Sequence, residues 1–135
     1  MENSKERKLV AGIFEDDKSY YEIIHRILEE AGFTVAFIAT TLQAALDEIA
    51  QFEVYGGVNL VTVDGNLGDF NYGQDAKKII QRLRALSPQT IIIGLSGNSL
   101  PVESQDHSRP GVNVDLGKSN TIQLKSTLQT LFAAN

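Results

Sequence analysis

The chain of 135 residues (14.8 kDa) has the length of one domain and can bury a single hydrophobic core. It contains no cysteine, which excludes disulfides and thiolate metal sites, and its net charge of −5 argues against a surface that binds nucleic acid. No apolar stretch approaches the roughly 20 residues of a membrane span, and the polar leader at residues 1–8 lacks the apolar core of a signal peptide. We therefore expect a cytoplasmic domain that contacts neither nucleic acid nor membrane.

Apolar segments typical of strands alternate with segments typical of helices along residues 9–133. The expected strands are residues 9–14, 33–39, 60–63, 90–95 and 112–116. A first helix is expected at residues 19–31. Three more are expected around apolar residues at helical spacing: Leu42, Ala45, Leu46 and Ile49; Ala76, Ile79, Ile80 and Leu83; Ile122, Leu124, Leu128, Leu131 and Phe132. This alternation predicts an α/β fold with a parallel sheet, right-handed crossovers and helices on both faces.

Two local signals refine this prediction. Thr40 and Gln43 have the spacing of a weak capping box for the second helix, and Pro88 ends the third.

A further helix is due between the last two strands, but residues 97–111 contain serines, two prolines and two glycines, with only Leu100 and Val102 as apolar anchors. We expect a short helical turn or a mobile loop there.

Four of the expected strands lead directly into residues that can bind or transfer a charged group. The first strand is followed by an acidic run, the third by one carboxylate, the fourth by a hydroxyl and the fifth by an amine. These residues are Glu15, Asp16 and Asp17; Asp64; Ser96; and Lys118. Because parallel strands end at one edge of a sheet, we expect these groups to lie within reach of one another.

This set of residues suits phosphoryl transfer to Asp64 with a divalent metal. A carboxylate nucleophile forms an acyl phosphate. Asp64 beside Glu15 and Asp16 concentrates negative charge, and each like-charged pair at about 4 Å costs on the order of 4 kcal/mol at an effective dielectric of about 20. Mg²⁺ offsets this repulsion because it binds carboxylate oxygens and retains several waters. Asp16 and Asp64 would supply ligands, with Glu15 in support and the backbone carbonyl of Asn66 as a third oxygen.

The remaining two groups would act on the phosphoryl oxygens. Lys118 would pair with one oxygen as a point charge, and Ser96 would donate a hydrogen bond to another. Each residue taken alone has an ordinary explanation, since a carboxylate after a strand is commonly a helix N-cap or a turn residue. Their joint occurrence on four strand ends favours the functional interpretation.

With these motifs, the chain resembles the receiver domain of two-component response regulators, over nearly all of residues 9–133. In that family an acidic pair follows the first strand, the phospho-acceptor aspartate ends the third, a Ser or Thr ends the fourth, and a lysine ends the fifth. The matching residues here are Glu15 and Asp16, Asp64, Ser96, Lys118 and, two residues past the acceptor, Asn66. The resemblance implies a flavodoxin-like sheet in the order 2-1-3-4-5 and Mg²⁺ as cofactor.

The resemblance also implies partners and an activity. Asp64 would take a phosphoryl group from a histidine kinase or phosphotransfer protein, or from a small donor such as acetyl phosphate. The chain would be a signalling receiver and not an enzyme, apart from self-catalysed phosphorylation and dephosphorylation of Asp64. Its output would be a changed interaction with a downstream protein or within a homodimer.

Three positions depart from the family pattern. Ser119 follows the lysine where the family commonly has a cis proline, Asp115 occupies the position of the aromatic switch residue, and the loop at residues 65–73 lacks the usual Met-Pro and is one residue longer. An inward turn of Asp115 would bury an unpaired carboxylate, which is costly. We therefore expect an atypical output region, in which residues 97–111 respond to phosphorylation.

Three alternatives belong to other functional classes. A phosphorylation-independent pseudo-receiver would keep the fold as a binding module. A small hydrolase of the aspartyl-phosphate type would carry a second acid two residues after its nucleophile, where this chain has Asn66. A flavodoxin-like electron carrier would have a hydroxyl-rich phosphate loop after the first strand, where this chain has acids.

Overall fold

Five parallel strands form one sheet. In this computed structural model, which describes residues 8–68, 73–97, 99–106, 108–118 and 121–132, the strands are β1 (Leu9–Phe14), β2 (Phe33–Ala39), β3 (Leu60–Val63), β4 (Ile91–Gly94) and β5 (Val114–Asp115). They lie in the order β2-β1-β3-β4-β5, and every neighbouring pair is parallel. The predicted fold class and strand order are confirmed. The two C-terminal strands are shorter than expected, because sheet pairing stops at Gly94 and begins only at Val114.

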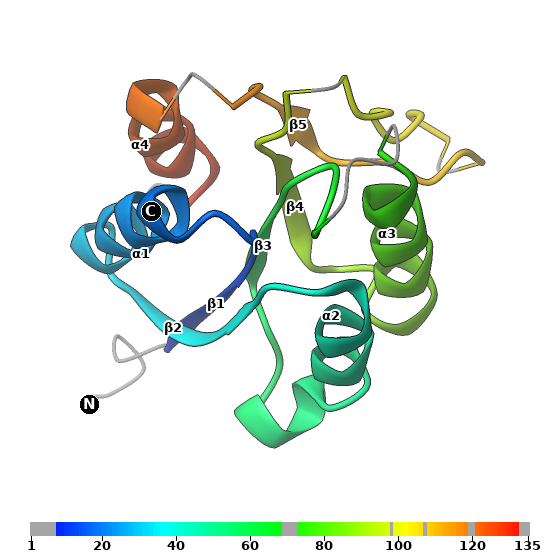
Figure 1. Cartoon of the computed structure of the whole chain (residues 1–135), viewed down its shortest axis with the longest axis horizontal. Coiled ribbons are helices and arrows are strands. Elements are labelled where there is room, and N and C mark those ends of the chain that lie inside the picture. The colour runs from blue at the N-terminus through cyan, green and yellow to red at the C-terminus, as the bar shows by residue number, and fades with distance from the viewer. Residues whose placement is uncertain (1–7, 69–72, 98, 107, 119–120, 133–135) are drawn as a thin grey trace.

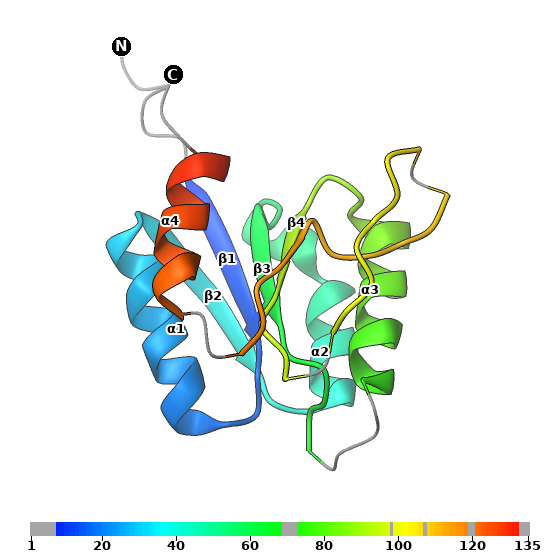
Figure 2. The same cartoon turned by 90° about the horizontal axis from the view of Figure 1, so that it is seen from above.

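Helices cover both faces of the sheet. They are α1 (Lys18–Glu30), α2 (Leu42–Ile49), α3 (Gln74–Leu86) and α4 (Thr121–Leu131), with a short 3₁₀ helix, η2 (Phe52–Tyr55), after α2. Figures 1 and 2 show α1 and α4 side by side on one face and α2 and α3 on the other. No helix in the described part of the chain combines the length and apolar character needed to cross a membrane.

Each face of the sheet has its own hydrophobic cluster. Ile24 and Leu28 of α1 pack with Leu124 and Leu128 of α4 on one face, and the predicted apolar residues of α3 pack on the other. All four residues of β3 are buried, as expected for a central parallel strand covered on both sides. Ile122 lies in α4 as expected but is 88% exposed, because α4 directs Leu124 and Leu128 at the sheet and Ile122 away from it.

The helix caps explain where two helices begin. Asp17 caps α1, and its side chain accepts a hydrogen bond from the Tyr20 backbone amide. Thr41 caps α2 by accepting from the Ala44 amide at 3.1 Å. The predicted capping box at Thr40 is therefore wrong by one residue, since it is the Thr41 hydroxyl that faces the free amides of the first turn.

The residues between β4 and β5, here called the β4–β5 segment (residues 97–111), form no helix in their described part. The Val112 amide donates to the carbonyl of Pro101 at 2.8 Å, and Val112 in turn accepts from the Glu103 amide at 3.0 Å, which makes a parallel bridge between Val102 and Val112. From α3, Arg84 donates to the Gly111 carbonyl and pairs with Glu103 at 3.3 Å. The expectation of irregular structure is confirmed. Residues 1–7 of the leader and Ser119 lie outside the described residues.

Candidate functional site

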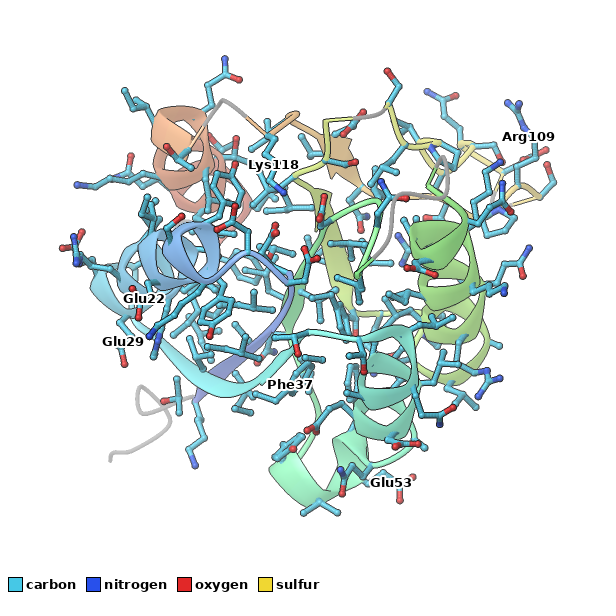
Figure 3. All side chains as sticks on the ribbon, in the orientation of Figure 1. Glu22, Glu29, Phe37, Glu53, Arg109 and Lys118 are labelled. Carbon is cyan, nitrogen blue, oxygen red and sulfur yellow. The ribbon has the colours of Figure 1, made fainter. Side chains whose placement is uncertain are left out.

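The carboxyl ends of the strands bring the predicted charged residues together. Glu15, Asp16 and Asp64 each offer a carboxylate oxygen, and these oxygens lie within 4.8 Å of one another. Lys118, which follows β5, places its Nζ 3.0 Å from Oε2 of Glu15 and 3.3 Å from Oδ2 of Asp64. Figure 3 shows the Lys118 side chain reaching from the loop after β5 toward this edge of the sheet. The site thus contains three acids and one cation from three strand ends.

Asp64 is buried at the end of β3 and is held by neighbours on both oxygens. Its Oδ1 accepts from the Gly65 amide at 2.8 Å, while Oδ2 faces Lys118. Its backbone amide donates to the Phe14 carbonyl at 2.9 Å, which extends the pairing of β3 with β1. Burial raises the pKa of Asp64, and the charge of Lys118 opposes this effect. A carboxylate in this position is fixed in orientation and only partly neutralised.

Glu15 is the most buried acid of the site, with 1% of its surface exposed. Its Oε2 accepts from Lys118 and from the Asp17 amide, whereas its Oε1 has no hydrogen-bond partner among the described residues. Burial, and secondarily the charge of Asp64, raises the pKa of Glu15 to about 7. A buried carboxylate oxygen without a donor is costly, and a bound cation would relieve that cost. The three acids therefore fit a hard divalent metal, whose preferred ligands are oxygens.

Asp16 is partly exposed and connects the acid pair with the loop after β3. Its Oδ2 accepts from the Gly68 amide at 2.8 Å. In the same loop, the side-chain oxygen of Asn66 accepts from the Gly73 amide at 3.0 Å, just before α3 begins. The Asn66 side chain therefore shapes the loop, and its backbone carbonyl remains the part predicted to bind metal.

Ser96 follows β4, as predicted, and its position depends on a residue that sequence analysis missed. Ser96 is 3% exposed, and a Cβ atom added at Gly65 would lie 2.4 Å from the Ser96 hydroxyl oxygen. The hydroxyl therefore sits against the glycine that directly follows Asp64. The signal in the sequence was Gly65 itself, because a glycine at the end of a buried strand allows another residue to approach the backbone closely.

A second missed residue is Asp75, in the first turn of α3. It is 6% exposed, and its Oδ2 accepts from the Leu67 amide at 2.8 Å. The Ala76 amide donates to the Gly65 carbonyl at 3.1 Å. The start of α3 thus fixes both ends of the short stretch that follows Asp64. No clear sequence signal indicates this role, because an acid in a first helical turn is commonly exposed.

Asp115 is half-buried, and its carboxylate lies inward against Gly94. Its Oδ2 accepts from the Leu100 amide at 3.1 Å, and its Oδ1 would be 2.8 Å from a Cβ at Gly94. Oδ1 is buried without a hydrogen-bond partner among the described residues. The inward position is possible because Gly94 leaves space for one oxygen and Leu100 supplies a donor for the other.

No family model and no curated protein matches this sequence. Solved structures do match. The N-terminal domain of a response regulator/sensory box/GGDEF protein from Carboxydothermus hydrogenoformans is 25% identical, with a TM-score of 0.64 over 90% of this chain and 91% of that one. A CheY-like receiver domain from Methylobacillus flagellatus is 24% identical, with a TM-score of 0.68 over 92% and 98%. The chain has the fold of a response-regulator receiver domain.

The receiver fold also matches parts of longer regulators. The Salmonella typhimurium RcsB response regulator is 17% identical, with a TM-score of 0.70 over 93% of this chain and 61% of that one. The acids, Ser96 and Lys118 follow the strands after which the sequence predicted them. The β4–β5 segment lacks a helix in its described residues, and Asp115 occupies the position noted above as a departure from the family pattern.

Proposed function

We propose that this chain is a phospho-acceptor receiver of a two-component phosphorelay, with Asp64 as the acceptor. The observation that carries this proposal is the position of Lys118, whose ammonium contacts both Glu15 and Asp64 at the common strand edge. A lysine in contact with two buried acids can also bind the oxygens of a phosphoryl group on Asp64. The receiver fold supports a receiver role in general, and the phosphoryl chemistry is the specific part of the proposal.

The transfer proceeds at the Asp64 carboxylate. One carboxylate oxygen attacks the phosphorus of the donor, and an O–P bond forms as the donor's P–N bond (phosphohistidine) or P–O bond (acetyl phosphate) breaks. The electron pair of the broken bond stays with the donor, so imidazole, after taking up a proton, or acetate is released. Water later attacks the acyl phosphate, which returns the Asp64 carboxylate and inorganic phosphate. Apart from this self-catalysed cycle, we assign no enzymatic activity.

Glu15, Asp16, Asp64 and the backbone carbonyl of Asn66 would hold Mg²⁺. The metal would supply neutralisation of charge on the transferring oxygens. The chain's own contribution is the acid cluster, in which Glu15 Oε1 has no hydrogen-bond partner among the described residues. Lys118 donates to one phosphoryl oxygen and the Ser96 hydroxyl donates to another. Residues that follow β5 and β4 thus stabilise the negative charge of the acyl phosphate.

The proposed partners are proteins. A histidine kinase or phosphotransfer protein supplies the phosphoryl group in the cytoplasm, and a downstream protein or a second copy of the chain responds to it. We assign no direct contact with nucleic acid or membrane. The hydrogen bond from the Leu100 amide to Asp115 supports a response to phosphorylation in the β4–β5 segment.

Intact mass measurement after incubation with acetyl phosphate and Mg²⁺ tests the acceptor assignment. The wild-type chain should gain the mass of one phosphoryl group, and Asp64→Asn should gain none. Asp47→Asn, a substitution of an acid on α2, is the matched control and should gain the same mass as wild type. A gain that persists in Asp64→Asn would overturn the assignment. A wild-type chain with no gain and no beryllofluoride binding would instead be a phosphorylation-independent pseudo-receiver.

A further inference from the structure

Tyr20 in the first turn of α1 makes two separate contacts with Lys118. Its hydroxyl donates a hydrogen bond to the Lys118 backbone carbonyl, across 98 positions of sequence. The Lys118 ammonium lies 5.0 Å from the centre of the Tyr20 ring, within the range of a cation–π interaction. One side chain therefore contacts both the backbone and the charged end of the lysine.

The position of Tyr20 is itself well determined. Its amide bonds to the side chain and the carbonyl of Asp17, the N-cap of α1. Its ring packs against the hydrophobic cluster between the sheet and α1. Burial, and next the charge of Glu15, raises the pKa of Tyr20, so the hydroxyl remains a donor at neutral pH.

Glu15 and Asp64 contact the ammonium of Lys118, whereas the backbone of Lys118 has little else to hold it. It follows Gly117, whose φ of +81° takes the chain out of the sheet by a conformation that favours glycine. Among the described residues, the only hydrogen bond to the Lys118 backbone comes from Tyr20. A lysine ammonium is a point charge on a flexible stem. Contacts with both the backbone and the ammonium therefore restrict the positions that the charge can take.

We propose that Tyr20 is a positioning residue that holds Lys118 against the acceptor site, through a hydroxyl bond to its backbone and a ring face beneath its ammonium. This inference rests on the proposed phospho-acceptor function for its effect on rate. The positioning itself is a property of the chain without phosphate, so it can be measured separately.

NMR of the protein without phosphate tests the positioning. The ring current of Tyr20 should shift the Lys118 Hε resonances from their ordinary range. Tyr20→Phe should keep this shift and Tyr20→Leu should abolish it, while Tyr20→Phe should move the Lys118 carbonyl carbon resonance because the hydroxyl donor is gone. Tyr21→Phe on the same helix is the control and should change neither signal. Lys118 signals that are the same in wild type and Tyr20→Leu would overturn the inference.

The rate of phosphorylation by acetyl phosphate tests the functional consequence. Tyr20→Phe should slow it by about 2-fold to 10-fold, the range expected for one hydrogen bond. Tyr20→Leu should slow it by about a further 2-fold to 5-fold through loss of the ring contact. In a Lys118→Ala background both changes should have no further effect, because Tyr20 acts through the lysine.

The outcomes separate the two proposals. If wild type is phosphorylated and Tyr20→Leu reacts at the wild-type rate, the inference fails and the proposed function stands. The inference also fails if Tyr20→Leu slows the reaction equally in the Lys118→Ala background, since Tyr20 would then act by general stability. If wild type is not phosphorylated, the proposed function fails and the NMR shifts alone decide the positioning. Thermal unfolding midpoints show whether each variant is folded.

Discussion

The ammonium of Lys118 lies 3.0 Å from Oε2 of Glu15, although 103 positions separate the two residues in the chain. This ion pair satisfies only one oxygen of a fully buried carboxylate, because Oε1 has no hydrogen-bond partner among the described residues. Asp64 is a second carboxylate in contact with the same ammonium. The cluster therefore holds more negative charge than its single cation neutralises, and protons or metal ions should bind to it.

Stability without metal should fall as the pH rises from 5 to 8. The pKa of Glu15 is about 7 in the folded chain, against 4.5 as its ordinary value. Between these two pKa values, the folded state binds more protons than the unfolded state. The stability that Glu15 contributes is therefore complete below about pH 4.5 and is lost as the pH rises through about 7. The free energy of unfolding, measured by urea titration in EDTA, should be lower at pH 8 by up to about 3 kcal/mol.

Glu15→Gln should flatten this pH dependence, since the amide carries no titrating charge. Asp64, whose pKa is raised mainly by burial, contributes in the same direction and leaves a smaller slope. Glu53→Gln is the matched control: Glu53 is exposed and lies at the far end of the molecule from Lys118 (Figure 3). Equal pH slopes in wild type and Glu15→Gln would contradict the assignment of this effect to Glu15.

Asp16→Ala should weaken Mg²⁺ binding while the fold stays intact. Asp16 is partly exposed, and its removal lowers the repulsion within the acid cluster. Loss of a direct ligand should cost at least as much as loss of an outer-shell partner, about 10-fold in affinity. Isothermal titration with Mg²⁺ measures this, with Asp17→Asn as control because asparagine keeps the cap of α1. Similar losses in both variants would indicate a diffuse effect of charge and not a ligand.

Most of the sheet and the site could be predicted from sequence because their signals are local. β1, β2 and β3 have the expected bounds, since continuous apolar runs with charged ends mark buried parallel strands. The acids after β1 and β3 meet because these two strands are neighbours, and Ser96 follows the next strand, β4. Lys118 follows β5, which pairs only with β4 among the described strands, and its long side chain reaches Glu15 and Asp64. The roles of Gly65 and Tyr20 were missed for the opposite reason: each depends on a contact with a residue far away in the chain.

Gly65→Ala should impair binding of a phosphoryl analogue. The added Cβ would lie 2.4 Å from the Ser96 hydroxyl oxygen, closer than such atoms can approach, so Ser96 must move. Beryllofluoride affinity, measured by fluorescence or NMR titration with Mg²⁺, should fall by about 10-fold, comparable to loss of one charge-assisted hydrogen bond. Gly97→Ala is the control because a Cβ there meets nothing within 4 Å. An unchanged affinity in Gly65→Ala would show that Ser96 does not contact the analogue.

Gly12→Ala should destabilise the fold without affecting the site chemistry directly. A Cβ at Gly12 would lie 2.0 Å from Cζ of Phe37, whose ring also packs with Phe14, Phe52 and Tyr55. Overpacking of this kind costs about 1 to 3 kcal/mol in the free energy of unfolding. Phe37→Leu in the same chain should recover part of the loss, since a smaller side chain makes room. Additive losses in the double variant would contradict a direct clash.

The β4–β5 segment could not be predicted in detail because its contacts are few and non-local. Arg84 bonds it to α3 through the Gly111 carbonyl, and Asp115 bonds it to β5 through the Leu100 amide. Neither partner could be assigned from spacing along the chain. Polar side chains and the short backbone bridge to Val112 hold this segment, and of its two apolar anchors Leu100 is buried while Val102 is 54% exposed. Limited apolar burial is typical of an element that can change conformation.

Phosphorylation should change hydrogen exchange most strongly in the β4–β5 segment. Under the proposed function, charge gained at Asp64 would draw the Ser96 hydroxyl toward it, and Ser96 directly precedes this segment. Exchange with and without beryllofluoride should differ at the Leu100 amide, the donor to Asp115. Asp115→Ala should remove the protection of this amide in the free state, whereas Asp115→Asn should keep it because its carbonyl oxygen still accepts. If beryllofluoride alters exchange in α4 and leaves the Leu100 amide unchanged, the signal leaves the domain through the opposite face.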